Sequence, residues 1–196
     1  MINKLNNSNC PSFQANLKVS GLNLGSAKKL KEVERLFAEK TRHYADDVLE
    51  ISHLKNQNDL GRFFHTAEFD LNGKNVASKI LGGLKDFCKE NSPEDVAKGL
   101  VRIFKYGKAK GKFALQHDEK VKNLRRVLAL DLHNTKKSII KEKDGNSMWA
   151  KRFHAIAEGN KARAAALKGE IEKIDNKKNE VFEKITDHPI FDDCCL

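Results

Sequence analysis

A lysine-rich segment contains the residues of this sequence whose types and spacing are best suited to chemistry. Residues 105–113 read Lys-Tyr-Gly-Lys-Ala-Lys-Gly-Lys-Phe. The two glycines favour a flexible loop whose ammonium groups could reach several phosphates, and Tyr106 and Phe113 could stack on unpaired bases. More cations precede and follow the loop. The predicted nucleic-acid-binding residues are Arg102, Lys105, Tyr106, Lys108, Lys110, Lys112, Phe113, Lys120, Lys122, Arg125 and Arg126.

The positive charge is concentrated around this segment. The chain has a formal net charge of +10, and residues 102–141 contain 12 Lys or Arg against 3 acids. The first 100 residues are nearly balanced, whereas residues 169–196 hold 4 basic and 8 acidic residues. A basic middle followed by an acidic end indicates either a polyanionic partner or charge pairing within the chain. In the second case, Glu170, Glu172 and Glu180 would cover the basic residues.

The lysine-rich segment also has interpretations other than nucleic-acid binding. It is not a phosphate-binding loop of the NTPase kind, because three residues separate Gly107 from Gly111 and Phe113 stands where Ser or Thr would hold magnesium. An acidic protein, an anionic membrane face and a solvated linker between two helices remain open as alternatives to nucleic acid.

Two of the seven histidines invite a metal or acid–base hypothesis. His53 and His65 are predicted on the apolar face of neighbouring strands, where a buried pair could bind a metal or tune a proton transfer. The spacing fixes no third ligand. We therefore expect satisfied core or rim histidines and predict no metal site.

The remaining reactive side chains form no catalytic motif. The spacing of the four cysteines matches no zinc pattern, and free thiols in a reducing cytoplasm are expected. Cys88 lies on the apolar stripe of a predicted helix, which favours burial over nucleophilic chemistry. No cofactor is predicted, and a non-enzyme is favoured. No apolar run approaches the length of a membrane span, and the N-terminal residues do not resemble a secretory signal, so a cytoplasmic location is expected.

Hydrophobic periodicity predicts an α+β fold for the first part of the chain. Residues 12–20, 47–53 and 62–71 alternate apolar and polar side chains, which is typical of half-buried strands. Ser26 can cap a helix whose apolar positions include Val33 and Phe37. The prediction is a small three-stranded antiparallel sheet with one packed helix.

After the Asn72–Gly73 turn the pattern becomes helical. A stripe begins at Val76, a second helix begins at Ser92-Pro93 and ends at Gly107, and a third begins near His117. A last long helix follows Asp144–Gly145, with Leu167, Ile171, Ile174, Val181 and Ile185 on one face. The C-terminal half is therefore predicted to be mostly α-helical and to end in a long helical hairpin.

These patterns divide the chain into three parts: a flexible N-terminal segment (1–11), an α+β domain (12–114) and a basic-to-acidic helical hairpin or extension (115–196). The predicted function is non-enzymatic binding of a polyanion, nucleic acid first, through the basic loop and the following helix. The alternative is an interaction or scaffold protein that binds a protein partner, or self-associates, through the C-terminal helices around Leu167 and Ile174.

Overall fold

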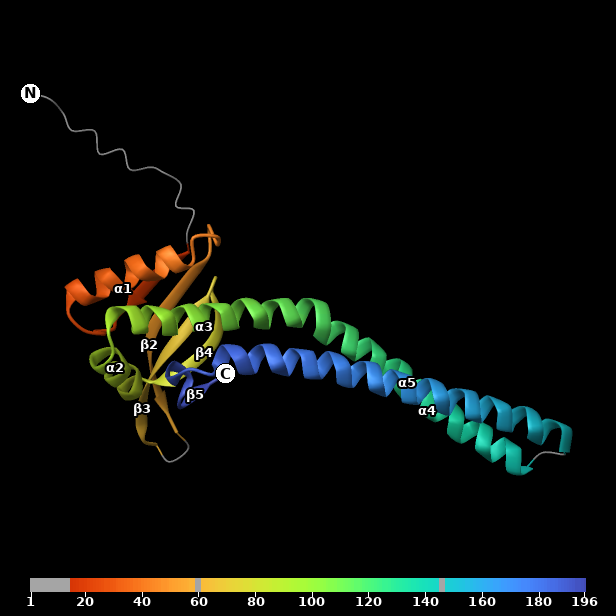
Figure 1. The fold of residues 1–196 in the computed structure, drawn as a ribbon. Helices are drawn as coiled ribbons and strands as arrows, with labels where there is room; N and C mark the ends of the chain where they lie inside the picture. The colour runs from red at the N-terminus through yellow and green to blue at the C-terminus, as the bar shows by residue number, and fades with distance from the viewer. Residues whose placement is uncertain (1–14, 59–60, 145–146) are drawn as a thin grey trace, which may run out of the picture. The chain divides into compact units, whose positions relative to one another are not determined.

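The computed structural model describes residues 15–58, 61–144 and 147–196, so the segment predicted to be flexible lies outside the described residues (Figure 1). The described residues form a mixed α+β protein with a helical C-terminal half, as predicted. They divide into two compact units. Met1–Lys108 and Lys184–Leu196 form the sheet unit, and Ala109–Glu183 forms the hairpin unit. The hairpin unit is thus inserted between two stretches of the sheet unit.

The sheet has five strands rather than the three that were predicted, in the order β1-β2-β3-β4-β5. Their bounds are β1 Asn16–Ser20, β2 Val48–Gln57, β3 Phe63–Leu71, β4 Lys74–Ile80 and β5 Cys194–Cys195. The sheet is also not wholly antiparallel, because β1 pairs with β2 in parallel while the other neighbours are antiparallel. The predicted antiparallel hairpin of β2 and β3 is confirmed.

A tight turn accounts for β4, one of the two strands that were not predicted. Asn72 and Gly73 have φ angles of 52° and 74°, and Leu71 pairs with Lys74 on either side of them. Two left-handed residues between paired strands form the type I′ geometry that an Asn-Gly sequence favours. The stripe from Val76 therefore begins on β4 and not on a helix, and Ile80 in that stripe is 58% exposed.

Three helices complete the core of the sheet unit: α1 (Ala27–Lys40), α2 (Leu81–Glu90) and the first part of α3 (Pro93–Phe113). α1 and α3 cross the same face of the sheet (Figure 1). Phe37 of α1 meets Phe104 of α3 edge to face, with ring centroids 5.9 Å apart. Both rings and the strand residues Ile51 and Phe69 are fully buried. The predicted caps also form, since Ser26 and Ser92 accept hydrogen bonds from backbone amides of the first turns.

The last residues of the chain return to the sheet unit. Ile190 is fully buried, and a Cβ on Gly99 of α3 would lie only 3.1 Å from its side chain. Lys79 of β4 is buried as well, and its ammonium group donates to the carbonyl oxygen of Asp192. The two-residue strand β5 then pairs with β4 at Ser78 and Lys79. This segment closes the end of the core and the edge of the sheet.

The hairpin unit consists of the end of α3, a π-helix η1 (Ala114–Asp118), α4 (Glu119–Asp144) and most of α5 (Ser147–Thr186). α4 and α5 run side by side (Figure 1). Ala157, Ala164 and Ile171 of α5 are buried and lie seven residues apart, which is the repeat of a coiled-coil seam. On α4, the buried residue near η1 is the apolar Val121. Farther along the helix the buried residues are polar: Asp131, Thr135 and Ser138.

Candidate polyanion-binding surface

The predicted flexible loop is helical. α3 does not end at Gly107 but continues to Phe113, and η1 connects it to α4. Close packing requires a glycine at position 107, because a Cβ there would lie 2.9 Å from side-chain atoms of both Leu71 and Val76. The alternating lysines consequently point around a helix instead of lining one side of a loop. Four of the eleven predicted residues, up to Lys108, belong to the sheet unit, and the other seven belong to the hairpin unit.

Arg102 has a structural contact at the end of α5. Its Nη1 donates to the carbonyl oxygens of Lys184, Ile185 and Asp187, at 3.0, 3.1 and 2.9 Å. The last carbonyls of a helix lack partners within the helix, and a cation near them also complements the helix dipole. Arg102 therefore joins α3 to the returning C-terminal segment within the sheet unit, and its guanidinium is committed to these backbone groups.

Lys108 is also engaged within the sheet unit. Its Nζ lies 2.8 Å from Oδ2 and 3.1 Å from Oδ1 of Asp47. Asn72 donates to the same carboxylate at 2.7 Å. Burial alone would raise the pKa of Asp47, but the hydrogen bonds from Lys108 and Asn72 outweigh it and hold the pKa below its usual value. Lys108 thus ties α3 to the start of β2.

The prediction that Tyr106 and Phe113 offer exposed rings for base stacking is wrong. They are only 8% and 6% exposed. Tyr106 packs on Phe191, with ring centroids 5.9 Å apart. Phe113 packs on Phe182 at 5.5 Å and on His117 at 4.7 Å. Both rings continue the buried stripe of α3 at helical spacing, and the intervening glycines conceal that continuation in the sequence.

Lys105 is exposed and lines a shallow cleft of about 420 Å³ in the sheet unit. The cleft is lined by Lys40, Lys98, Val101, Arg102, Lys105 and His188. Burial, followed by the charge of Arg102, lowers the pKa of His188, which favours its neutral form. Lys40 and Lys98 were not among the predicted residues. The spacing of Lys98, Arg102 and Lys105 on one helix face could have identified Lys98.

Ion pairs join α4 to α5 in the hairpin unit. Lys120 pairs with Glu170 at 2.6 Å and Arg125 pairs with Asp175 at 3.4 Å. These four side chains are 41–65% exposed, and such surface pairs are each worth about 0–1 kcal/mol. The acidic end therefore neutralises part of the basic helix, as the alternative of internal charge pairing requires. The carboxylates of Glu172 and Glu180 are exposed and make no ion pair with a described residue.

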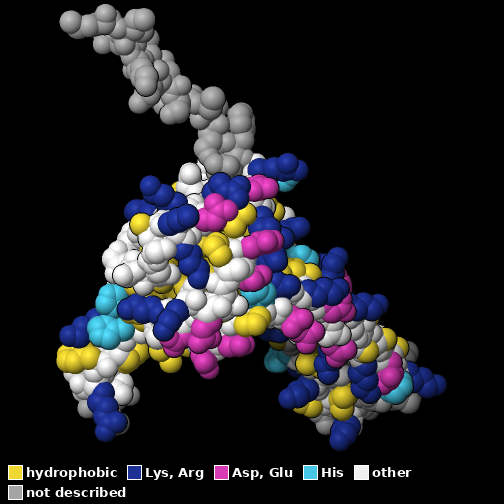
Figure 2. All heavy atoms as spheres, turned by 60° about the vertical axis from the view of Figure 1, so that its left-hand side comes forward, with side chains coloured by type: hydrophobic (Ala, Val, Ile, Leu, Met, Phe, Trp, Pro, Cys, Tyr) yellow, Lys and Arg dark blue, Asp and Glu magenta, His cyan; other side chains and the backbone are white. Residues whose placement is uncertain are grey.

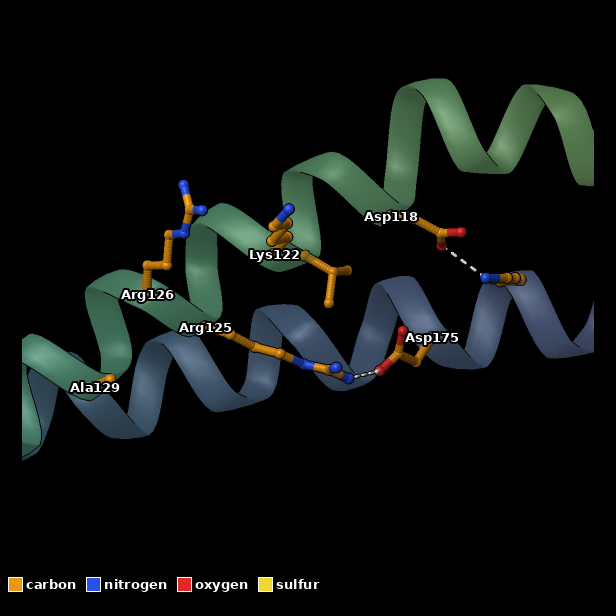
Figure 3. Close-up of a pocket in the computed structure, with 8 residues that line it drawn as sticks. Asp118, Lys122, Arg125, Arg126, Ala129 and Asp175 are labelled. Atoms are coloured by element: carbon orange, nitrogen blue, oxygen red, sulfur yellow. Dashed lines mark hydrogen bonds and ion pairs between the residues drawn. The ribbon is translucent and has the colours of Figure 1, made fainter.

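A groove of about 590 Å³ lies beside these pairs. It is lined by Asp118, Val121, Lys122, Arg125, Arg126, Ala129, Asp175 and Lys178. Asp118 pairs with Lys178 at 2.6 Å. Figure 3 shows Arg125 reaching towards Asp175 on α5, while Lys122 and Arg126 point away from α5. Because each of the two acids has a cationic partner, Lys122 and Arg126 are the excess positive charge of the groove.

The outer face of α4 extends this positive surface. Lys122, Arg126, His133 and Lys137 are exposed and are spaced four, seven and four residues apart, which places them on one helix face. They span about 22 Å at 1.5 Å per residue. We call these four residues the α4 basic row. The hydrogen bonds and ion pairs found among the described residues include none from this row.

No exposed carboxylate interrupts the α4 basic row. Asp131 is the one acid between residues 120 and 141, and it is 2% exposed. Arg163 of α5 donates to both of its oxygens, and this hydrogen bonding lowers the pKa of Asp131. On the face of the molecule drawn in Figure 2, Lys and Arg side chains are interspersed with Asp and Glu. The last turn of α3 adds Lys110 and Lys112, which are both exposed.

The described residues offer little for catalysis. Burial raises the pKa of the Cys88 and Cys194 thiols to about 11, so both are protonated at neutral pH and are poor nucleophiles. In the described ranges, no group of three or more His, Cys, Asp or Glu side chains could hold a metal ion. None of the helices in those ranges is long and apolar enough to cross a membrane.

Comparison with known proteins found no matching family model, no matching curated protein and no matching solved structure.

Proposed function

We propose that the protein is a non-enzymatic binding protein that engages a polyanion, nucleic acid first, through the α4 basic row. The observation that carries this proposal is the charge pattern on the outer face of α4. Lys122, Arg126 and Lys137 have no ion-pair partner among the described residues, and Asp131, the one acid between residues 120 and 141, is buried against Arg163. Asp118 and Glu119 border this row at its start and line a hollow with Lys122 and Arg126. From Lys122 onwards, a row of exposed cations on one helix face is suited to contact successive phosphates.

The ion pairs between α4 and α5 can add to this binding surface. Lys120 and Arg125 are more than half exposed, and their pairs with Glu170 and Asp175 are weak because water screens them. A phosphate that approaches either cation can replace the carboxylate at small cost. Binding would then release counterions from the nucleic acid, which supplies the free energy of sequence-independent association.

Duplex nucleic acid is the better candidate within this class. Single-strand-binding proteins add aromatic rings on which bases stack, each worth about 1–3 kcal/mol. Tyr106 and Phe113 were predicted to have this role, and both rings are buried. The α4 basic row offers phosphate contacts without stacking, so we expect a duplex to bind at least as tightly as a single strand of equal length.

The test compares two charge reversals of equal size on the two helices of the hairpin unit. Lys122→Glu with Arg126→Glu alters the α4 basic row, while Lys173→Glu with Lys177→Glu alters two exposed lysines of α5 that are also four residues apart. The expected result, measured by fluorescence anisotropy with a labelled 20-base-pair duplex, is at least tenfold weaker binding for the α4 variant and a much smaller loss for the α5 variant. Equal losses would mean that net charge alone governs binding.

No duplex binding by the unmodified protein, even at low salt, would contradict the proposal and favour the scaffold alternative. The structure changes where that alternative would act. Leu167 and Ile174 are half-buried on the face of α5 that forms the seam with α4, so they are engaged within the hairpin unit. Exposed apolar residues of the same unit would have to carry a protein interface instead. They include Val127, Leu130, Ile140 and Ile156.

A further inference from the structure

His53 and His65 lie on the same face of neighbouring strands, as predicted, and their rings are in direct contact. They lie on the neighbouring strands β2 and β3, and His53 is directly opposite Ala67 while His65 is opposite Lys55. The two histidines are therefore diagonal neighbours on one sheet face, within reach of long side chains. Nε2 of His53 lies 2.7 Å from Nδ1 of His65, and the ring centroids are 4.9 Å apart.

The pair is exposed and not buried as the sequence analysis expected. This part of the hairpin lies beyond the region of the sheet that the helices cover, so the alternation of residues continues without a core on either face. Solvent and ions can therefore reach both rings, and Figure 2 shows histidine side chains open at the surface of the face it draws.

We propose that His53 and His65 chelate a divalent transition-metal ion of the Cu²⁺ or Ni²⁺ class. Neutral imidazole nitrogens are common ligands for these ions, and metal–nitrogen bonds measure about 2.0–2.1 Å. Two such nitrogens bound at a right angle are about 2.9 Å apart. The observed 2.7 Å is the length of a hydrogen bond between the two rings, so an ion would have to displace the shared proton and bring both nitrogens to a common point. Cu²⁺ binds nitrogen ligands most strongly among the divalent first-row metal ions.

The surroundings leave room for the remaining ligands of such an ion. Water would fill the other coordination positions of such an ion, since no third ligand side chain joins the pair among the described residues. Lys55 lies directly opposite His65, and its ammonium group lies 4.0 Å from the ring centroid of Phe63. Lys55 and Phe63 form the next diagonal pair along the hairpin, so the lysine is directed along the strand away from His53.

The experiment titrates the metal-free full-length protein with CuCl₂ at pH 7.5 in a buffer that does not coordinate copper. The expected result is one tightly bound Cu²⁺ with two imidazole nitrogens in its electron paramagnetic resonance spectrum. His53→Ala or His65→Ala should weaken binding at least tenfold and remove one nitrogen from the spectrum. Both side chains are exposed, so neither variant should unfold the protein, which circular dichroism checks.

The matched control is His43→Ala, which removes an exposed histidine outside the pair and should leave the affinity unchanged. An affinity that is the same in His53→Ala as in the unmodified protein would overturn the site. A second titration compares NiCl₂ with ZnCl₂. Tighter binding of Zn²⁺ than of Ni²⁺ would contradict the assignment of the pair to the Cu²⁺ or Ni²⁺ class.

Discussion

At the scale of single residues, two glycines of α3 have opposite roles although the sequence presents them alike. Gly107 lies where α3 contacts the sheet, and a Cβ there would come within 2.9 Å of Leu71 and Val76. Gly111 lies one turn later with nothing within 4 Å of the same position. One glycine permits close packing, while the other only lowers the helix propensity of an exposed turn.

We therefore predict opposite signs for two alanine substitutions. Gly107→Ala should lower the free energy of unfolding by about 1–3 kcal/mol, because the added methyl group overpacks the contact between α3 and the sheet. Gly111→Ala should raise it by up to about 1 kcal/mol, because alanine is the better helix former. Urea unfolding followed by circular dichroism measures both. Stabilisation by Gly107→Ala would show that α3 does not approach the sheet as closely as the structure indicates.

Asp47 gives a prediction of pH dependence. Its pKa is held below the usual value, because the hydrogen bonds from Lys108 and Asn72 outweigh the opposing effect of burial. A carboxyl group whose pKa is lower in the folded state stabilises the fold above its unfolded pKa, and this stabilisation is lost as the pH falls through the folded value. Asp47→Asn removes it at neutral pH.

The expected result is that Asp47→Asn lowers the melting temperature at pH 7 and that its difference from the unmodified protein shrinks between pH 5 and pH 2. Thermal melts at several pH values measure this. Glu34→Gln is the control, because Glu34 is on α1, half-buried, and makes no ion pair with a described residue. A difference for Asp47→Asn that stays constant with pH would contradict the assigned ion pair.

At the scale of elements, the seam of the hairpin unit contains an asymmetric ion pair. Asp131 on α4 is 2% exposed, while its partner Arg163 on α5 is 60% exposed. Loss of the arginine leaves a buried carboxylate without its cation, which is costly, whereas loss of the aspartate leaves a solvated arginine. The pair thus helps to fix the register of α4 on α5. An ion pair with so exposed an arginine would ordinarily contribute little to this register.

We predict that Arg163→Ala lowers the melting temperature more than Asp131→Ala does. Differential scanning calorimetry of the two variants and of the double variant tests this, because the double variant should recover part of the stability that Arg163→Ala loses. The opposite order of the single variants would show that the carboxylate is solvated and that the seam opens at this point.

The element boundaries show which part of the fold could be predicted from the sequence. Alternating residues identified β2 and β3, and Ser26 and Ser92 marked two helix starts, because these signals depend on local geometry alone. β4 was missed because Val76, Ile80 and Leu84 happen to be four residues apart, which imitates a helix. The Asn72–Gly73 turn carried the correct signal, since this dipeptide favours a two-residue hairpin and therefore a strand on each side.

The candidate site was predictable in part. The charge pattern correctly located the excess of cations, and Lys122 and Arg126 lie on the exposed face of α4. It could not separate them from Arg102 and Lys108, because a lysine or arginine that binds a carbonyl or a buried aspartate has the same sequence signature as one that faces solvent. That distinction depends on residues 60 to 85 positions away in the chain.

At the scale of the whole molecule, the two units have different roles in the proposed function. Residues 184–196 complete the sheet unit, so the sheet unit contains the chain on both sides of the hairpin unit in the sequence. Within the hairpin unit, the acids of α5 pair with one side of α4 and leave the α4 basic row open. The excess of positive charge in the chain, which is +10 overall, therefore forms a positive surface on α4. The acidic end of the chain does not cancel it.

The most direct test of this account is the salt dependence of duplex binding by the full-length protein between 50 and 300 mM NaCl. Each phosphate contact contributes about −0.9 to the slope of log K against log salt concentration. The Lys and Arg residues of the α4 basic row, Lys122, Arg126 and Lys137, predict a slope of about −3. Lys122→Glu with Arg126→Glu should reduce its magnitude by about two. Absence of binding at 50 mM NaCl, or a slope that this variant leaves unchanged, would contradict the proposed binding surface.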